Sequence, residues 1–504
     1  DPSSSSSALI VPQPNTPDRY FIFAVDEPHH LNAATYPNQN TGFSPNEDDG
    51  FNNGFTYSVV DMNLNGGLGD VVTGEKNIEL TTYNPASTAE SSYKCSEKIT
   101  AVKSDDCDAF WVITHFIDRF YAFRVDQTGV DPNPVISQVG VTVPISGYRR
   151  NALGYMKASP EGDKIAVAHF GFATTEGGDG PGKVLLYDFD NVTGAVSNEL
   201  ELYDGDAPYG VEFSQSGERL YTTVGIGSGG SGDGFLMQFD LTLAQNQIAG
   251  RGTRVRNENG QDITPFSAGA IQLGPDGRIY RALFDFNTGN GNYLGVIENP
   301  EEIAGNLIYR ERGILVNVDN NRGSRIGLPP FIQSIFARSI DIVNSGNPND
   351  VNLNLCEGET YTLTYQNIAT ATYTWYFNDT PISNSTNTLD ISSSGNYRLE
   401  VDLNDGSCPL IGVANATFFE VPVVDATPPT DQLCDQDNNG SVDIDLSAYN
   451  NIIFGSQDQN IFQIRYFRSI ADATSDTDEI PNIFTSENNP QTIAARIENI
   501  NNPR

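Results

Sequence analysis

Basic residues are scarce in this sequence. Against 28 Lys and Arg stand 65 Asp and Glu, which gives a formal charge of −37 over 504 residues. A polyanion of this size repels nucleic acid and anionic lipid, so neither is an expected partner. The acidity suits a soluble surface and divalent cations instead, and the shortage of Lys and Arg argues against long amphipathic helices.

Long hydrophobic runs and catalytic signatures are also lacking. No run of 18 apolar residues occurs, so no membrane-spanning helix is expected. Ser228 comes closest to a Gly-x-Ser-x-Gly elbow, but Ile226 stands where the first glycine should be. The glycine-rich run 225–230 lies between two expected strands, not before a helix, so it lacks the geometry that binds phosphate. We therefore expect no catalytic residues, and a protein that is not an enzyme.

Cysteine is limited to five residues. Cys95 and Cys107 lie close together, and Cys356 and Cys408 bracket a second region, while Cys434 is left over. None has the Cys-x-x-Cys spacing of a zinc or redox site. Local pairs in an acidic chain of this kind predict disulfides formed in an oxidising compartment. The opening Asp-Pro-Ser, in place of Met, is expected if a signal peptide was removed or if the chain is a fragment.

What the sequence does contain is a repeat. Segments 153–167, 209–221 and 268–280 each read as strand, tight glycine-containing turn and strand, and 99–114 is a degenerate fourth copy. A period in the fifties with about four strands per unit is typical of a propeller blade. We therefore predict that residues 1–343 form a β-propeller with five complete blades. Phe331–Phe336 looks like a closing strand, and we expect six or seven blades in the intact protein.

Two smaller modules are expected after the propeller, so the predicted fold class is all-β. Residues 352–421 show short alternating strands, with Trp375 as the expected core tryptophan and Tyr397 as the expected tyrosine corner of an immunoglobulin-like β-sandwich. Residues 430–504 predict a second β-sandwich repeat module. Linkers are expected near residues 344–350 and 421–429.

Several segments together resemble one group of proteins. These are 10–23, 57–70, 97–102, 111–115 and 327–334. They are similar to segments of large secreted cell-surface proteins of gliding Bacteroidetes. The resemblance implies a propeller, immunoglobulin-like repeats and a sorting domain that the type IX secretion system reads. It also implies that further blade sequence precedes the serine-rich start, that a sorting domain follows Arg504, and that Cys434 pairs with a cysteine beyond that residue. The alternative is that Cys434 is a free thiol.

One motif in the last module predicts a calcium ligand set. Asp435, Asp437, Asn439 and Asp443 place oxygen ligands at alternating positions around Gly440, as at the start of a calcium loop. Leu446 stands where the bidentate Glu should be. The alternative is a solvated turn rich in Asp and Asn. Calcium is the only cofactor expected.

A second candidate site lies on one face of the propeller. His115 and His169 end equivalent strands of neighbouring blades, and Asp26 holds the analogous place in the first blade. These side chains could line a ligand or metal site, although ordinary polar strand ends explain them equally simply. The long loop 27–54, which contains His29 and His30, is expected on the same face, where recognition usually resides.

Three functions follow from these patterns. The first is a secreted or surface-attached binding protein, such as an adhesin or gliding-associated protein, whose propeller binds an extracellular glycan or surface protein. In that case the type IX machinery would be a partner during export. The second is a lactonase-like or lyase-like propeller enzyme. The third is a structural subunit or cargo held in a secretion complex.

Overall fold

A computed structural model gives the fold. It describes residues 5–6, 8–26, 53–175, 180–225, 234–262, 268–285, 288–289, 291–317, 323–334, 339–346, 350–404, 408–424 and 429–501. In this part of the chain, no helix is long and apolar enough to cross a membrane. The chain divides into two compact units, of which the first holds 1–339 and 402–410 and the second holds 340–401 and 411–504.

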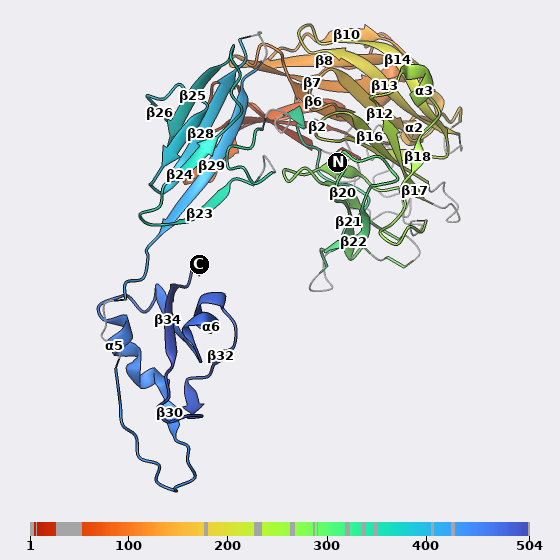
Figure 1. The fold of residues 1–504 in the computed structure, drawn as a ribbon. Helices are drawn as coiled ribbons and strands as arrows, with labels where there is room; N and C mark the ends of the chain where they lie inside the picture. The colour runs from red at the N-terminus through yellow and green to blue at the C-terminus, as the bar shows by residue number, and fades with distance from the viewer. Residues whose placement is uncertain are drawn as a thin grey trace. The chain divides into compact units, whose positions relative to one another are not determined.

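The described part of the first unit holds five antiparallel sheets in chain order, and they are the five predicted blades of a β-propeller (Figure 1). Each of the last four is a sheet of consecutive strands, as the repeat predicts. The strands of the first two sheets are β1(Ala8–Pro12), β2(Arg19–Val25), β3(Phe55–Asp61), β4(Asp70–Val71), β5(Ile78–Leu80), β6(Ile99–Lys103), β7(Ala109–Phe116), β8(Arg119–Asp126), β9(Gly129–Val130) and β10(Val135–Gln138). The strands of the other three are β11(Met156–Ala158), β12(Lys164–His169), β13(Gly182–Asp190), β14(Ala195–Gly205), β15(Pro208–Phe213), β16(Arg219–Val224), β17(Phe235–Asp240), β18(Thr253–Arg254), β19(Ile271–Leu273), β20(Ile279–Ala282), β21(Tyr293–Ile297) and β22(Tyr309–Leu315).

The turn between the first two strands of each repeated blade has one geometry. Gly162, Gly217 and Gly277 have φ of 78°, 73° and 74°, and each amide N–H donates to the carbonyl three residues earlier. A left-handed φ clashes with a β-carbon, so glycine is the residue that adopts it at least cost. The glycines that define the sequence repeat are therefore required by the turn.

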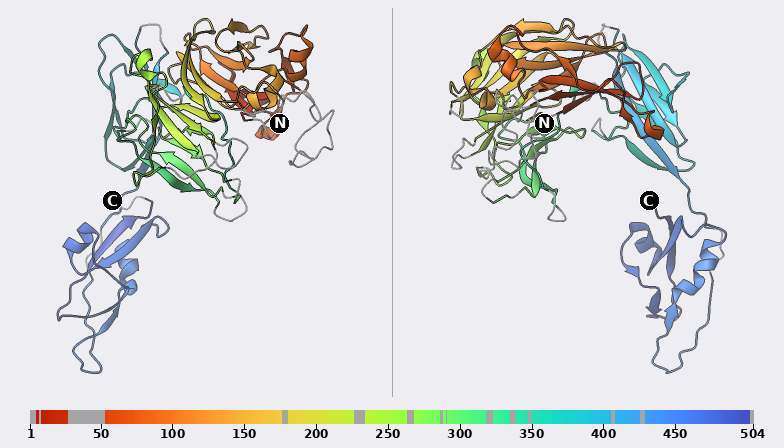
Figure 2. Two further views of the ribbon diagram at one scale, coloured as in Figure 1. Left: turned by 90° about the vertical axis from the view of Figure 1, so that its right-hand side faces the viewer. Right: turned by 180° about the vertical axis from the view of Figure 1, so that it is seen from behind.

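The blades stack face to face through apolar side chains. The first strands of successive sheets are neighbours in the order β1, β6, β11, β15 and β19. Every residue of β7 and of β15 is buried, since sheets cover both faces of these strands. The first sheet differs, because Ile10 of β1 keeps 58 % of its surface exposed. Figure 2 shows the succession of sheets in this unit from two other sides.

Segments that are not strands complete the first unit. Among the residues that the structure describes, three short helices connect strands, with bounds α1(Thr88–Tyr93), α2(Tyr148–Asn151) and α3(Gln245–Ile248), and two 3₁₀ turns are η1(Asn65–Gly67) and η2(Ile145–Gly147). The predicted closing strand at 331–336 is wrong in its described part, because 331–334 form no strand. This segment instead uses its polar groups to bond the inner strands. Ile335 and Phe336 lie outside the described residues.

The predicted β-sandwich begins the second unit. One sheet has the order β23-β29-β28-β25-β26, and β24 pairs with β27 in a second. Trp375 is fully buried, as predicted, and its indole N–H donates to the Thr386 carbonyl oxygen at 2.8 Å. Tyr397 forms a tyrosine corner, because its hydroxyl donates to the carbonyl oxygen of Ser393 at 2.9 Å. The strands are β23(Asn352–Cys356), β24(Tyr361–Thr364), β25(Thr372–Phe377), β26(Thr380–Ile382), β27(Thr388–Ile391), β28(Gly395–Asp402) and β29(Leu410–Phe419).

The last module is smaller and includes helix. It holds a two-stranded sheet, β30-β33, and a three-stranded sheet, β32-β31-β34. Leu446, Tyr466, Ile480 and Phe484 form one cluster of its buried core, and Phe454, Phe462 and Phe467 are buried as well. The elements are β30(Asp443–Asp445), η3(Leu446–Tyr449), α5(Asn450–Phe454), β31(Phe462–Phe467), α6(Ile470–Ser475), β32(Glu479–Ile480), β33(Ile483–Thr485) and β34(Ala494–Asn499).

Candidate functional site: the disulfide-linked turn and the buried polar groups

The turn between β6 and β7 departs from the glycine rule of the other blades. The Cys107 amide N–H donates to the Ser104 carbonyl oxygen at 3.0 Å, which is the hydrogen bond that Gly162 makes to Ser159 in the next blade. Cys107 therefore occupies the glycine position, and its φ is 64°. A side chain in this left-handed region costs roughly 1–2 kcal/mol, so the cysteine is placed here against a local backbone preference.

Cys107 forms a disulfide with Cys408, and this pairing corrects the sequence prediction. The local pairs expected from Cys95 with Cys107, and from Cys356 with Cys408, do not form. The Cα atoms of Cys107 and Cys408 are 5.4 Å apart although the residues are separated by 301 positions. Cys95 is a buried thiol that follows α1, and burial raises its pKa strongly, so it is kept as an inert thiol.

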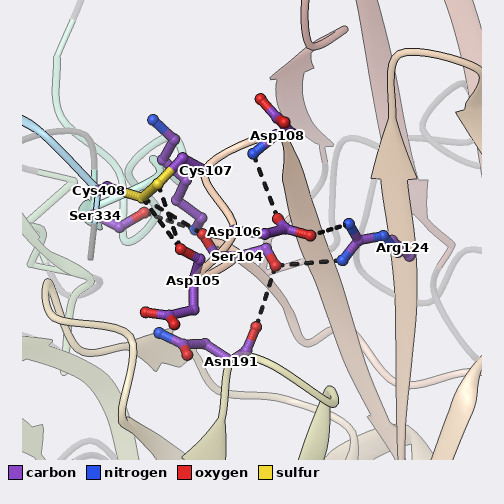
Figure 3. The surroundings of a disulfide bond; sticks show 10 residues. Ser104, Asp105, Asp106, Cys107, Asp108, Arg124, Asn191, Ser334 and Cys408 are labelled. Atoms are coloured by element: carbon purple, nitrogen blue, oxygen red, sulfur yellow. Dashed lines mark hydrogen bonds and ion pairs between the residues drawn. A yellow bond between two sulfur atoms is a disulfide. The ribbon is translucent and has the colours of Figure 1, made fainter. Parts of the chain in front are cut away.

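The disulfide-bearing turn is held from two sides (Figure 3). Arg124 of β8 forms an ion pair with Asp106, and it also donates to the Ser104 hydroxyl at 3.3 Å. From the neighbouring blade, the Asn191 carbonyl oxygen accepts hydrogen bonds from the Ser104 hydroxyl at 3.2 Å and from the Trp111 indole at 2.8 Å. The turn is therefore held by contacts from two blades in addition to its disulfide.

The Cys408 side of the bond is enclosed. This residue is 2 % exposed, and its sulfur lies 3.7 Å from the carbonyl oxygens of Ser104 and Asp105. Burial of Cys408 limits access of soluble thiols to its side of the bond.

A buried ion pair lies on the inner strands. The Lys157 ammonium of β11 is 3.1 Å from a Glu212 carboxylate oxygen of β15, and the two side chains are 1 % and 0 % exposed. Lys157 also donates to the Gln272 side-chain oxygen at 2.5 Å, and the Gln333 side chain donates to Glu212 at 2.9 Å. Burial lowers the pKa of Lys157, and Glu212 opposes that shift. These four side chains connect the third, fourth and fifth blades with the segment 331–334, which follows the last blade.

A second buried charge cluster involves the start of the chain. The Glu97 carboxylate accepts hydrogen bonds from the Ser5 amide at 2.6 Å and from the Ser5 hydroxyl at 2.7 Å. Next to it, the Lys98 ammonium donates to the carbonyl oxygens of Ala152 at 2.7 Å and of Leu153 at 2.9 Å. Burial lowers the pKa of Lys98 to about 7. The serine-rich start is thus packed inside the propeller where it is described.

The two predicted histidines meet, but in the interior. The rings of His115 and His169 are 5.1 Å apart between centroids at an interplanar angle of 69°, and each residue is 1 % exposed. Phe120 packs on His115 and Phe172 on His169. Burial lowers the pKa of His115 to about 3, and the charge of Lys98 adds to the shift. The same two causes lower the pKa of His169 well below its usual value, so both rings are neutral.

Asp26 has different surroundings. Its carboxylate accepts the Asn53 amide N–H at 2.7 Å, and its carbonyl oxygen lies 3.5 Å from the Cys95 sulfur. Among the described residues, no group of three or more His, Cys, Asp or Glu side chains is arranged to hold a metal ion. A ligand site made by Asp26 with His115 and His169 stays a prediction, and the loop that contains His29 and His30 lies outside the described residues.

The predicted calcium loop forms a chain of side-chain-to-backbone turns. Asp435 accepts the Gly440 amide at 2.7 Å, and Asp437 accepts the Asn439 amide at 3.2 Å. Asn439 in turn accepts the Ser441 amide at 2.8 Å, and Asp443 accepts the Thr485 hydroxyl at 2.5 Å. Because amide and hydroxyl donors already use these oxygens, a cation would compete with them. The calcium prediction remains untested.

The sequence analysis predicted neither the pairing of Cys107 with Cys408 nor the buried ion pair of Lys157 and Glu212. The sequence did contain a signal for the first. In the degenerate blade copy, cysteine stands at the position of the turn glycine. The sequence contained no signal for the ion pair, because Lys157 and Glu212 lie on strands of different blades and meet only when those blades stack.

These features define a disulfide-linked β-propeller with two further modules. Residues 430–503 match the family described as the Flavobacterium inter-domain disulphide bond domain. The match points to proteins of the Bacteroidetes type and covers the last module, including Cys434. No curated protein matches the chain.

Solved structures with some likeness to the chain include three propeller-type proteins. TolB from Acinetobacter baumannii is 15 % identical, with 61 % of this chain and 66 % of that chain covered and a TM-score of 0.27. A putative 6-phosphogluconolactonase from Bacteroides fragilis is 11 % identical, with 61 % and 81 % covered and a TM-score of 0.32. The β-propeller domain of the Trilobed protease from Pyrococcus furiosus is 8 % identical, with 81 % and 95 % covered and a TM-score of 0.28. At these values the likenesses carry no argument about activity, and this chain spans just under two thirds of the TolB chain.

Proposed function

We propose that this chain is part of an extracellular binding protein in which the propeller presents a recognition surface and the C-terminal modules act as a spacer. The observation that carries the proposal is the Cys107–Cys408 disulfide, because such bonds form and persist in oxidising compartments. The match of residues 430–503 to a domain named for an inter-domain disulphide is compatible with the same location.

The buried charges of the propeller are not placed for acid–base catalysis. The ion pair of Lys157 and Glu212 and the rings of His115 and His169 have almost no exposed surface. A general acid or base must reach a substrate proton, directly or through one water. These groups act instead as internal polar contacts that hold the blades together. The alternative of a lactonase-like or lyase-like enzyme therefore has less support, and the alternative of a structural subunit has no specific observation in its favour.

The finer form of the proposal is an adhesin or gliding-associated surface protein that the type IX secretion system exports. Its ligand would be an extracellular glycan or a surface protein, since the acidic surface disfavours nucleic acid and anionic lipid. We include in this proposal that Cys434, an exposed thiol in the matched module, pairs with a cysteine of a neighbouring domain.

The test has two arms. Purified protein is applied to a glycan array and to whole cells, and a strain that lacks the gene is compared with its parent for attachment and gliding. Binding of the purified chain together with loss of attachment supports the proposal. Unchanged attachment and gliding in the deletion strain, with no binding by the protein, would reject it.

A further inference from the structure

The disulfide gives this protein a covalent connection between its two ends that is shorter than the polypeptide backbone. The chain leaves the first unit after Ser339, returns to it for residues 402–410, and leaves again at Ile411. Cys408 lies in the returning segment, and its bond to Cys107 closes a loop that spans 301 positions. Along the covalent chain, a force applied at the C-terminal end passes through β29 and then reaches the propeller through the disulfide, so it bypasses the polypeptide between Cys107 and Cys408.

The backbone conformation at Cys107 indicates that this turn is built to hold the cysteine. Cys107 holds the left-handed turn position that Gly162, Gly217 and Gly277 hold in three other blades, with a φ of 64°. A glycine would form this turn at lower cost. The exception falls on the one turn in these four blades that is bonded to Cys408.

The surroundings of the turn suit it to carry tension. Arg124 connects it to β8, and the Asn191 carbonyl oxygen connects it to the neighbouring blade (Figure 3). The Lys103 amide donates to the Ser334 hydroxyl at 2.9 Å, which adds a third connection at the end of β6. Tension on Cys107 is thus shared between two blades and the segment that follows the last blade.

We propose that the Cys107–Cys408 disulfide is a tension-carrying latch that transmits force from the C-terminal modules directly to the propeller. The polypeptide between the two cysteines, which includes most of the propeller and strands β23 to β28 of the sandwich, then lies off the covalent force path. The physiological use of the latch rests on the proposed function as an extracellular tether. The force path itself does not.

The latch predicts a large difference in extension. A fully stretched chain spans at most about 3.6 Å per residue, so a closed loop of 301 positions withholds about 108 nm from the extended length. The segments between the two cysteines add no contour length while the bond is intact, so the release of β29 from β23 and β28 should lengthen the oxidised protein only by residues outside the loop.

Single-molecule force extension with handles fused before Asp1 and after Arg504 measures this difference. The variants are Cys408→Ser and Cys107→Gly, the second of which restores the turn residue of the other blades. Cys95→Ser, which removes a cysteine outside the disulfide, is the matched control. We expect the parent and the control to extend about 108 nm less than the two latch variants. Equal extension of all four proteins would overturn the latch.

A cell experiment separates the latch from the proposed function. A strain that carries Cys107→Gly is compared with its parent for attachment at rest and under shear flow. The latch predicts normal attachment at rest and early detachment under flow. Equal resistance to flow contradicts the latch, whereas the absence of attachment at rest in the parent contradicts the proposed binding function and leaves the force measurement to decide on the latch.

Discussion

The propeller and the last module differ in how far their most buried ion pairs are enclosed. In the propeller, Lys157 and Glu212 are buried together, whereas in the last module Arg468 and Glu487 form an ion pair with nearly half of each side chain exposed. The propeller has apolar clusters that extend across several sheets, and the module has a core cluster of four side chains. The difference teaches that a large stacked architecture can enclose both members of an ion pair, while each ion pair in the described part of the small module, including those of the buried Glu498, keeps at least one partner in contact with water.

The largest expected effect comes from breaking the buried pair. Glu212→Gln removes the charge that faces Lys157 and leaves a buried ammonium without its counterion, so we expect a loss of about 3–5 kcal/mol in the free energy of unfolding. Chemical denaturation of the oxidised chain measures it. The matched exposed variant is Glu487→Gln, for which we expect no measurable change. A similar loss of unfolding free energy in both variants would contradict the proposed difference between the buried and the exposed ion pair.

The next effect tests the independence of the small core. Phe484→Ala deletes one of the four side chains in the core cluster of the last module, and we expect a loss of about 3 kcal/mol confined to that module. Calorimetry should show the transition of the module lowered or lost while the transition of the propeller keeps its temperature. A common shift of all transitions would show that the two regions unfold together.

A third effect concerns pH. His115 has a pKa of about 3 in the folded protein, whereas an unfolded histidine titrates near 6.5. Between these values the unfolded state binds more protons, so stability is present above about pH 6.5 and is lost as the pH falls. His115→Leu should reduce the acid slope of the unfolding free energy by about 1.4 kcal/mol per pH unit below pH 6. Urea midpoints from pH 4 to pH 8 provide the measurement, and an unchanged slope contradicts the burial of this ring.

Thiol labelling gives a smaller, local contrast. Cys434 is exposed in the last module and Cys95 is buried in the propeller, where its raised pKa keeps it protonated. A maleimide added to the folded oxidised chain should label Cys434 rapidly and Cys95 only after denaturation, as peptide mass spectrometry can show. Rapid labelling of Cys95 in the folded protein would contradict its enclosure.

The smallest expected effect is that of calcium. The sequence predicts that Asp435, Asp437, Asn439 and Asp443 bind the ion, while the structure shows that their oxygens already accept hydrogen bonds. If calcium binds, it should raise the melting temperature of the last module modestly, and Asp437→Ala should remove the rise. If a calorimetric titration with calcium shows no heat of binding and the melting temperature does not change, the result supports a turn that binds no metal.

Much of the fold follows from sequence because its signals are local. Gly162, Gly217 and Gly277 are required by individual turns, and Trp375 and Tyr397 occur in the strands where a sandwich needs them. The disulfide could not be predicted in this way, since sequence proximity favours Cys95 as the partner of Cys107 and cannot show that residues 402–410 return to the first unit. The buried pair of Lys157 and Glu212 depends in the same way on the stacking of distant strands.

The position of the disulfide is the central claim, and non-reducing peptide mapping of the native protein tests it most directly. Digestion with thiols blocked, followed by mass spectrometry, should yield a cross-linked peptide that joins Cys107 to Cys408, with Cys95 recovered as a blocked thiol. Peptides that join Cys95 to Cys107, or Cys356 to Cys408, would contradict both the structure and the latch.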